Sequence, residues 1–236
     1  MIEVLSPEQA HRASAPLDHG HYEGRWIFSF AYSEPGHPHF GTLDVFSDDT
    51  LSPGASSPLT PRKDEELVTY CIDGEFRHFD DRGHDGVLKP GWVQHTTAGR
   101  GVCQSEINNP HDRPVRFIRM WFAPNEKGVE PHYEQKPVQR VQRTNRFLPL
   151  VSNTALGALK MNADAQVFSS FLEEGKSLQY ALPESDGLFV YVLEGGPLEV
   201  NAKPIAAQGS AQIRGEPTVS LKALHDCELL MADVRL

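Results

Sequence analysis

One eight-residue pattern occurs twice in this chain and limits the folds that it can adopt. The copies are LVTYCIDG at residues 67–74 and LFVYVLEG at residues 188–195, and both follow Leu-x-x-Tyr-x-(Ile/Leu)-(Asp/Glu)-Gly. An internal repeat at this spacing indicates two copies of one structural unit. We therefore expect two domains of similar topology, an N-terminal domain at 1–135 and a C-terminal domain at 136–236.

The stretch around the first copy, residues 54–106, consists of short strand-like runs that are separated by turn signals. Leu67–Ile72 is apolar and β-branched, and Asp73-Gly74 then turns the chain. Pro90-Gly91 precedes a further run at Trp92–Thr97. Short strands with Gly or Pro between them predict an antiparallel jelly roll or β-barrel. We therefore expect an all-β chain with two such domains.

Two further strands are predicted before this stretch. Trp26–Phe30 alternates along its length, and Leu43–Phe46 is a strand that Asp48-Asp49 is expected to end. Between them, His37-Pro38-His39 has the spacing of a pair of metal ligands. Nothing downstream supplies the other half of a site in register with it, so we interpret it as part of a loop.

A long strand is predicted near the end of the first domain. The run VRFIRMWF at Val115–Phe122 would place Phe117, Arg119 and Trp121 on one face, because side chains alternate along a strand. The segment Asn125–Arg140 is rich in Pro, Glu and Gln and is expected to connect the two domains.

Charge and composition exclude several classes of protein. The net charge of -10 argues against a nucleic-acid partner, which would require a basic face. No apolar run approaches the ~20 residues of a membrane helix, and MIEVLSPEQA lacks the features of a signal peptide. The cysteines Cys71, Cys103 and Cys227 are odd in number and have no paired spacing, which indicates reduced thiols. We expect a cytoplasmic monomer with no membrane partner.

The chain also resembles a known family, and the signature lies in its first half. The signature comprises the run at 67–74, Pro90-Gly91, Thr97-Ala98-Gly99-Arg100-Gly101 and Ser105-Glu106, and it is similar to that of the pirins. The Thr-Ala-Gly-Arg-Gly run is its most specific part, and the resemblance covers most of the chain. It implies a bicupin, with two antiparallel jelly-roll (cupin) β-barrels. It also implies one divalent transition metal and a quercetin-cleaving dioxygenase activity in typical members.

The ligand positions that the resemblance implies carry different residues here. Typical pirins hold the metal with a His-x-His pair and a His-x-Glu pair, which fall on Thr60 and Arg62 and on Gln104 and Glu106. Only Glu106 matches. Thr and Gln are weak ligands, and Arg is always protonated and cannot ligate. Both pairs should still face the barrel interior, because alternate strand residues share a side. We expect no metal cofactor; the alternative is a single divalent transition metal.

Loss of the metal would leave the Glu106 carboxylate buried without a counter-charge, which is costly. The Arg62 guanidinium could grip it with two hydrogen bonds. We hypothesise an internal network of Arg62, Gln104 and Glu106, joined by Arg119. Two arginines against one glutamate would form a positive cavity suited to a small anionic or phenolic ligand. The alternative is that the loop at 56–65 swings outward and leaves Arg62 in solvent.

Two more side chains are candidates near this pocket. His95 precedes the Gly-Arg-Gly turn and could supply a pocket nitrogen if it faces inward; otherwise it is an exposed or rim histidine. Cys103 is close to Arg100 in sequence and is expected to be close to Arg62 in the fold. Positive charges such as these can lower the pKa of a thiol. Cys103 is therefore a candidate redox thiol, with a small apolar residue as the simpler alternative.

Three functions of different class remain at this point. The favoured one is a pirin-like protein that lacks a complete metal site, binds a small ligand or acts in regulation or stress, and has little or no catalysis. The second is a metal-dependent quercetin-type dioxygenase, and the third is a cysteine-based redox sensor. The residues Thr60 and Arg62 favour the first. The second domain has Ala181 and Pro183 at the matching offsets, so we expect it to be a packing partner.

Overall fold

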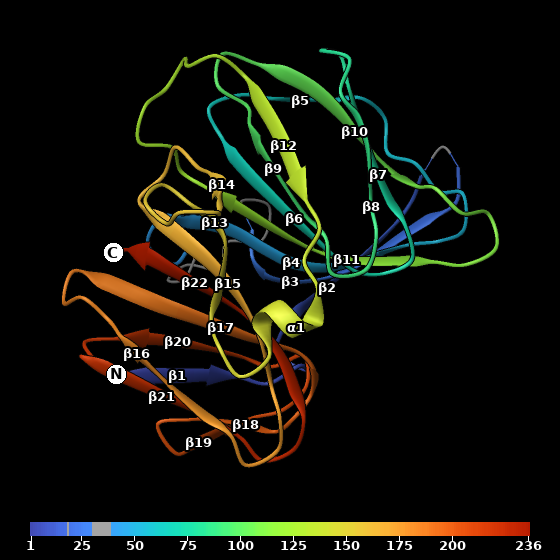
Figure 1. Cartoon of the computed structure of the whole chain (residues 1–236). Helices are drawn as coiled ribbons and strands as arrows, with labels where there is room; N and C mark the ends of the chain where they lie inside the picture. The colour runs from blue at the N-terminus through green and yellow to red at the C-terminus, as the bar shows by residue number, and fades with distance from the viewer. Residues whose placement is uncertain (18, 30–38) are drawn as a thin grey trace.

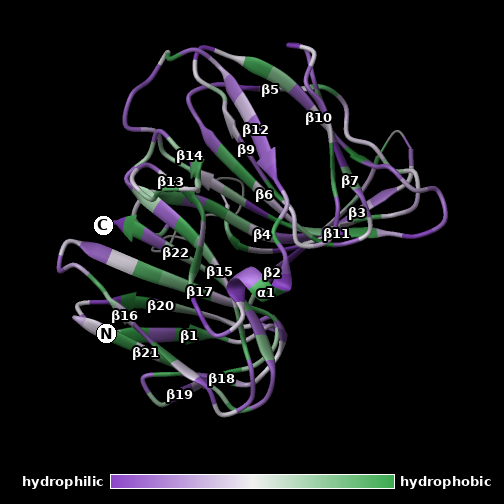
Figure 2. Cartoon of the chain, viewed as in Figure 1, coloured by the Kyte–Doolittle hydropathy of each residue, from purple (hydrophilic) through white to green (hydrophobic). Residues whose placement is uncertain are grey.

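The structure is a computed structural model that describes residues 1–17, 19–29 and 39–236. Within these residues nearly all regular structure is β, and the one helix is α1 (Arg140–Arg143). Figure 1 shows two layered β domains, with most of the blue-to-green part of the chain above most of the orange-to-red part, and with the dark-blue β1 in the lower domain. Figure 2 shows that the strands of both domains carry hydrophobic stretches next to hydrophilic ones, and that many of the outer loops are hydrophilic.

The N-terminal domain is built from two antiparallel sheets. The seven-stranded sheet contains, in spatial order, β12 (His132–Lys136), β9 (Val93–Thr97), β6 (Glu66–Asp73), β11 (Val115–Phe122), β4 (Leu43–Leu51), β3 (His21–Phe28) and β2 (His11–Pro16). The four-stranded sheet contains β5 (Thr60–Arg62), β10 (Val102–Asn108), β7 (Phe76–Asp80) and β8 (Asp85–Leu88).

The C-terminal domain repeats this arrangement, except that its edge strand β14 pairs in parallel with β13. Its seven-stranded sheet contains β1 (Ile2–Leu5), β20 (Ser210–Arg214), β17 (Asp186–Gly195), β22 (Cys227–Arg235), β15 (Ala165–Leu172), β13 (Leu148–Ser152) and β14 (Leu159–Lys160). Its four-stranded sheet contains β16 (Ser177–Ala181), β21 (Thr218–Ala223), β18 (Leu198–Val200) and β19 (Lys203–Ile205). The repeated octets lie on β6 and β17, which are the third strands of their sheets, so the prediction of an all-β, two-domain chain is confirmed.

The tyrosine of each octet joins the domains. Tyr70 of β6 donates a hydrogen bond to Glu228 of the C-terminal domain at 3.1 Å, and Tyr191 of β17 donates to Asp48 of the N-terminal domain at 2.7 Å. Both rings lie in one hydrophobic cluster that takes residues from both seven-stranded sheets, including Phe46. Burial, together with the nearby carboxylates, raises the pKa of both phenols. The repeated tyrosine is therefore an interdomain contact.

The structure differs from the predicted division of the chain at two places. β1 pairs with β20, with Ile2 opposite Ile213, so the first residues belong to the C-terminal sheet and not to the domain predicted at 1–135. Ile2 and Val4 pack against the hydrophobic cluster of the C-terminal domain, which explains this pairing. β12, inside the predicted connection at 125–140, is an edge strand of the N-terminal sheet.

Asp48 and Asp49 do not end a strand, as the sequence suggested, because β4 continues through them to Leu51. The end of the predicted strand at Trp26–Phe30 and most of His37-Pro38-His39 lie outside the described residues. None of the helices in the described part of the chain is long and apolar enough to cross a membrane.

Candidate functional site

The four positions matched to the family's metal ligands lie on neighbouring strands of the four-stranded sheet. Thr60 of β5 is opposite Gln104 of β10, and Arg62 is opposite Val102. On the other side of β10, Glu106 is opposite His78 of β7. The sheet register therefore gathers the predicted residues on the adjacent strands β5 and β10 and brings His78 of β7 beside them.

Arg119 of β11 is the centre of the buried charges at this place. Its Nε donates to Asp49 Oδ2 at 2.6 Å, and its two terminal nitrogens donate to Glu106 Oε2 at 3.1 Å and to the Tyr22 hydroxyl at 3.2 Å. Asp49 also accepts hydrogen bonds from the hydroxyls of Ser47 and Tyr22. One guanidinium thus joins two carboxylates inside the barrel. Hydrogen bonds between charged groups of this kind are stronger than those between neutral groups.

The charges of this network act on one another strongly because they are buried. Burial by itself would lower the pKa of Arg119, but the carboxylates of Asp49 and Glu106 outweigh it and the pKa is raised. Burial raises the pKa of Asp49, and Arg119 opposes that rise. Gly24 of β3 leaves the room for this cluster, because a Cβ there would lie 2.5 Å from Asp49 Oδ1. The network therefore depends on a glycine within a strand.

Arg62 does not make the predicted ion pair with Glu106. Its guanidinium lies 4.1 Å from the centre of the Trp121 ring, and its nearest ion pair is with Glu65 at 4.0 Å. The pair that we predicted for Arg62 is made by Arg119. The expected excess of positive charge is also absent here, because Asp49 adds a second buried carboxylate that the sequence analysis did not include.

His95 lies away from these residues. It is opposite Val68 on β6, whereas its neighbour Gln94 is opposite Thr69, so the two side chains are on different faces of the sheet. His95 Nε2 lies 2.8 Å from Glu66 Oε2, and Glu66 also accepts a hydrogen bond from the backbone of Asn162 in the C-terminal domain. His95 therefore belongs to the interface between the domains and not to the barrel interior.

The donor atoms at the family's ligand positions do not fit a transition metal. The Thr60 hydroxyl donates to the Pro58 carbonyl at 3.0 Å, Arg62 is a cation, and one oxygen of Glu106 is bound to Arg119. Within the described ranges, no group of three or more His, Cys, Asp and Glu side chains could hold a metal ion.

Three buried polar atoms at this place have no hydrogen-bond partner in the described part of the chain. They are Arg62 Nε, His78 Nδ1 and Gln104 Oε1. The other nitrogen of His78, Nε2, bonds Asp80 at 3.0 Å, and the ring stacks on Tyr133. Burial lowers the pKa of His78, although Asp80 opposes this, so the neutral ring leaves Nδ1 as an acceptor. The site thus offers one donor and two acceptors.

Asp49, Tyr22 and His78 were missed in the sequence analysis. Asp49 follows Asp48 directly, and paired acidic residues are usually exposed and end strands, so their type argued against burial. The useful signal was Gly24, a glycine within a strand, which indicates a close approach of other atoms.

Cys103 lies in surroundings that do not favour a thiolate. Burial and the neighbouring Asp81 carboxylate raise its pKa, whereas a redox-sensing thiol needs a lowered one. Asp81 Oδ1 accepts a hydrogen bond from the Cys103 backbone at 3.0 Å, which holds the carboxylate there. Cys71 and Cys227 are fully buried, and burial raises the pKa of each to about 12.

We expect Cys103 to react with a thiol reagent more slowly than free cysteine at neutral pH. Asp81→Asn should speed its reaction roughly 3- to 10-fold, since one pKa unit changes the thiolate fraction tenfold. The measurement is the rate of reaction with a disulfide reagent between pH 7 and 9. Cys103→Ser is the control and should abolish the fast-reacting thiol, and equal rates in the parent and Asp81→Asn would contradict the prediction.

Comparison with known proteins gives consistent results over the length of the chain. The family profile described as Pirin matches residues 9–122, and that described as Quercetinase C-terminal cupin domain matches residues 150–234. A Pseudomonas aeruginosa protein, named for an assumed quercetin 2,3-dioxygenase activity, is 34% identical over 92% of this chain and 94% of its own. A quercetin 2,3-dioxygenase of Escherichia coli K12 is 28% identical, with 92% and 93% covered. The crystal structure of the bacterial pirin YhhW from Escherichia coli, in complex with nickel(II), has a TM-score of 0.91 at 25% identity and covers 100% of this chain and 99% of YhhW.

Proposed function

The chain belongs to the pirin family, and from that premise we propose that it is a pirin without a catalytic metal, which binds a small hydroxylated ligand in its N-terminal barrel. The observation that carries this proposal is the hydrogen bond from the Arg119 guanidinium to the carboxylate of Glu106. Glu106 is the one residue that matches the family's ligand set. A carboxylate that is already paired with a buried cation is a poor ligand for a second cation. We expect little or no catalysis, and a cytoplasmic protein, since all three cysteines are free thiols.

The unpartnered polar atoms support a ligand with hydroxyl groups. A hydroxyl can donate to His78 Nδ1 or Gln104 Oε1 and accept from Arg62 Nε. Trp121 adds an aromatic surface on which Arg62 now lies. The Arg62–Glu65 contact, at 4.0 Å between partly exposed side chains, is weak, so Arg62 can move along the Trp121 ring to make room for a phenolic ligand and still donate to it.

A metal-dependent quercetin dioxygenase is the second candidate. It is favoured by the names of the Pseudomonas aeruginosa and Escherichia coli relatives, which cover more than nine-tenths of this chain. The two candidates differ in one measurable property. The dioxygenase needs a metal ion for each chain, whereas the binding protein that we propose does not.

The test combines metal analysis with ligand binding. The protein is incubated with Fe, Ni, Cu, Mn and Zn salts, dialysed against chelator, and analysed by mass spectrometry. We expect well under one ion per chain, no oxygen uptake with quercetin, and saturable quenching of tryptophan fluorescence by quercetin that weakens in Trp121→Leu. A near-equimolar metal with turnover would instead support the dioxygenase. Absence of quenching would reject the binding site in the barrel.

A further inference from the structure

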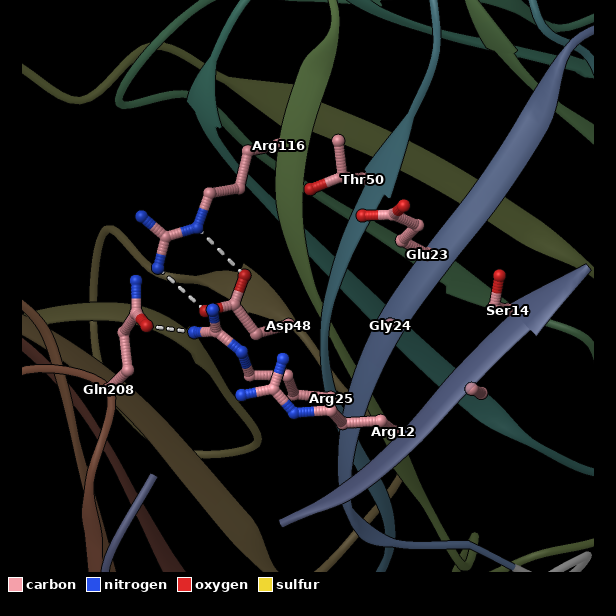
Figure 3. Close-up of a pocket in the computed structure, with 10 residues that line it drawn as sticks. Arg12, Ser14, Glu23, Gly24, Arg25, Asp48, Thr50, Arg116 and Gln208 are labelled. Atoms are coloured by element: carbon pink, nitrogen blue, oxygen red, sulfur yellow. Dashed lines mark hydrogen bonds and ion pairs between the residues drawn. The ribbon is translucent and has the colours of Figure 1, made fainter. Parts of the chain in front are cut away.

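A second site lies outside the N-terminal barrel, where the two domains meet. It is a cavity of about 350 Å³ that β2, β3, β4 and β11 line on one side and Gln208, in the turn between β19 and β20, lines on the other. Figure 3 shows that three guanidinium groups, those of Arg12, Arg25 and Arg116, extend into this region near Gln208. None of the hydrogen-bonded side chains of the Arg119 network lines it, although Gly24, which packs against that network, does.

The strand register places two of these arginines directly opposite each other. Arg12 of β2 is the cross-strand partner of Arg25 of β3, and Arg25 is the partner of Asp48 of β4. Like charges that are directly opposite on antiparallel strands destabilise the pairing. A counter-charge is therefore expected beside Arg12 and Arg25.

The nearest carboxylate, that of Asp48, is already used. Arg116 holds it with two hydrogen bonds, at 2.8 and 2.6 Å, and the Tyr191 hydroxyl donates to it as well. Arg25 donates to the neutral Gln208 amide oxygen. Arg12 is close enough to the Glu8 carboxylate to help lower its pKa, but neither Arg12 nor Arg25 has a carboxylate in ion-pair contact among the described residues.

The other carboxylate that lines the cavity is that of Glu23, two residues from Arg25 along β3. Glu23 is opposite Ser14 of β2 and Thr50 of β4, and it forms no ion pair within the described ranges. The negative charge of Glu23 would repel an anionic group, so the part of a ligand next to Glu23 must be neutral or carry a hydrogen-bond donor. Arg116 pairs with Asp48 and, at 3.6 Å, with Glu194. The positive charge left in the lining is therefore that of Arg12 and Arg25, and Glu23 offsets part of it.

The backbone of Gln208 supports a binding role for its side chain. Its φ is 63°, in the left-handed region, where glycine is favoured and glutamine is uncommon. The turn itself therefore does not require a glutamine. Its amide reaches across the domain boundary to Arg25 and fixes the direction of that guanidinium. Residues in sparsely populated backbone regions tend to occur at ligand sites.

We propose that this cavity binds a small oxyanion, a phosphate or carboxylate group, between Arg12 and Arg25. The planar guanidinium fork matches both groups with paired hydrogen bonds. A volume of about 350 Å³ is adequate for a small metabolite that carries such a group. Because Gln208 belongs to the other domain, the bound anion also stabilises the contact between the domains.

The experiment measures calorimetric binding and thermal stabilisation by inorganic phosphate and by succinate, at an ionic strength held constant with sodium chloride. We expect one saturable site in the parent. Arg25→Gln should weaken it about tenfold or more, since a charge-assisted hydrogen bond is worth at least that factor. Gln208→Gly, which suits the left-handed backbone, should also weaken binding while the fold is kept. Binding of phosphate alone identifies a phosphoryl ligand, and binding of succinate alone identifies a carboxylate ligand.

Arg12→Glu gives the sharpest contrast. It turns the like-charge pair with Arg25 into an ion pair, so the free variant should melt no lower than the parent, yet neither anion should stabilise it. Arg77→Gln, which breaks an exposed ion pair with Asp85, is the matched control and should bind as the parent does. The proposal is overturned if neither anion stabilises the parent beyond chloride, or if Arg12→Glu and Arg77→Gln respond alike. Quercetin quenching should be unchanged in Arg12→Glu, which separates this site from the barrel.

Discussion

Replacement of Arg119 by methionine is expected to destabilise the protein by about 3–5 kcal/mol, because it leaves buried carboxylates without their cation. Asp49 is fully buried, and the Glu106 side chain is only 12% exposed, so water cannot replace the guanidinium. For a chain of this size the loss corresponds to a decrease in melting temperature of roughly 6–20 °C. Thermal and urea unfolding of the variant and the parent measure it.

The stability that Arg119→Met loses should depend on pH in a defined direction. Burial raises the pKa of Asp49 and Arg119 opposes this, so the folded-state pKa should rise further when Arg119 is removed. A raised folded-state pKa means that the folded state holds the proton more tightly. The stability of Arg119→Met should therefore fall as the pH rises above about 4, the ordinary Asp value.

Two variants make this prediction specific. Asp49→Asn in the Arg119→Met background should restore part of the lost stability, since it removes the unpaired charge. Arg77→Met is the matched control, because its pair with Asp85 is exposed and is expected to be worth only about 0–1 kcal/mol. If Arg119→Met melts within a degree or two of Arg77→Met, the network does not have the role that we assign to it.

The second large effect is expected from rebuilding the ligand set of typical pirins. In the combined variant Thr60→His, Arg62→His, Gln104→His, three imidazoles and the Glu106 carboxylate would lie on alternate positions of β5 and β10. Imidazole and carboxylate together suit Fe, Ni, Cu, Mn and Zn. We expect three imidazoles and the ion to compete successfully with Arg119 for the Glu106 carboxylate, so that this variant retains about one ion per chain after dialysis against chelator. In the parent, Arg119 keeps Glu106 because no imidazole helps to hold an ion, and none is retained.

The control replaces the same three residues by alanine, which removes Arg62 without adding ligands. If the metal binds through the rebuilt set, the alanine variant should stay empty and Glu106→Gln should weaken binding by the histidine variant. A histidine variant that binds no more metal than the alanine variant would show that the pairs on β5 and β10 do not converge. Mass spectrometry of the dialysed proteins distinguishes these results.

The fold could be predicted from the sequence because its signals are local. The repeated octet, the alternation within strands and the glycines of the turns each involve only a few consecutive residues. They led to two similar β domains, and β6 and β17 do occupy matching places in their sheets. The shared face of Phe117, Arg119 and Trp121 was predicted in the same way.

The partners in the site could not be predicted because they depend on how distant strands align. Arg119 bonds Asp49 only because β11 lies beside β4, and the sequence places these residues 70 positions apart. The face of His95 depends on its register with Val68, which alternation alone does not fix. Arg62 was assigned to Glu106 because the family positions coincide, but Trp121 offers its guanidinium an aromatic surface instead.

The pairing of β1 with β20 affects how the protein can be synthesised and divided. Ile2 of β1 pairs with Ile213 of β20, which is synthesised near the end of translation. The N-terminal barrel can therefore form before β1 has a strand to pair with. Such distant pairing slows folding. A fragment that starts after the first domain would lack β1 and expose β20 as a bare sheet edge, which other strands can join. A short peptide carrying Ile2–Leu5 could fill that edge, as in strand complementation. The boundary between the domains along the sequence is therefore not a place where the chain can be cut into two self-sufficient halves.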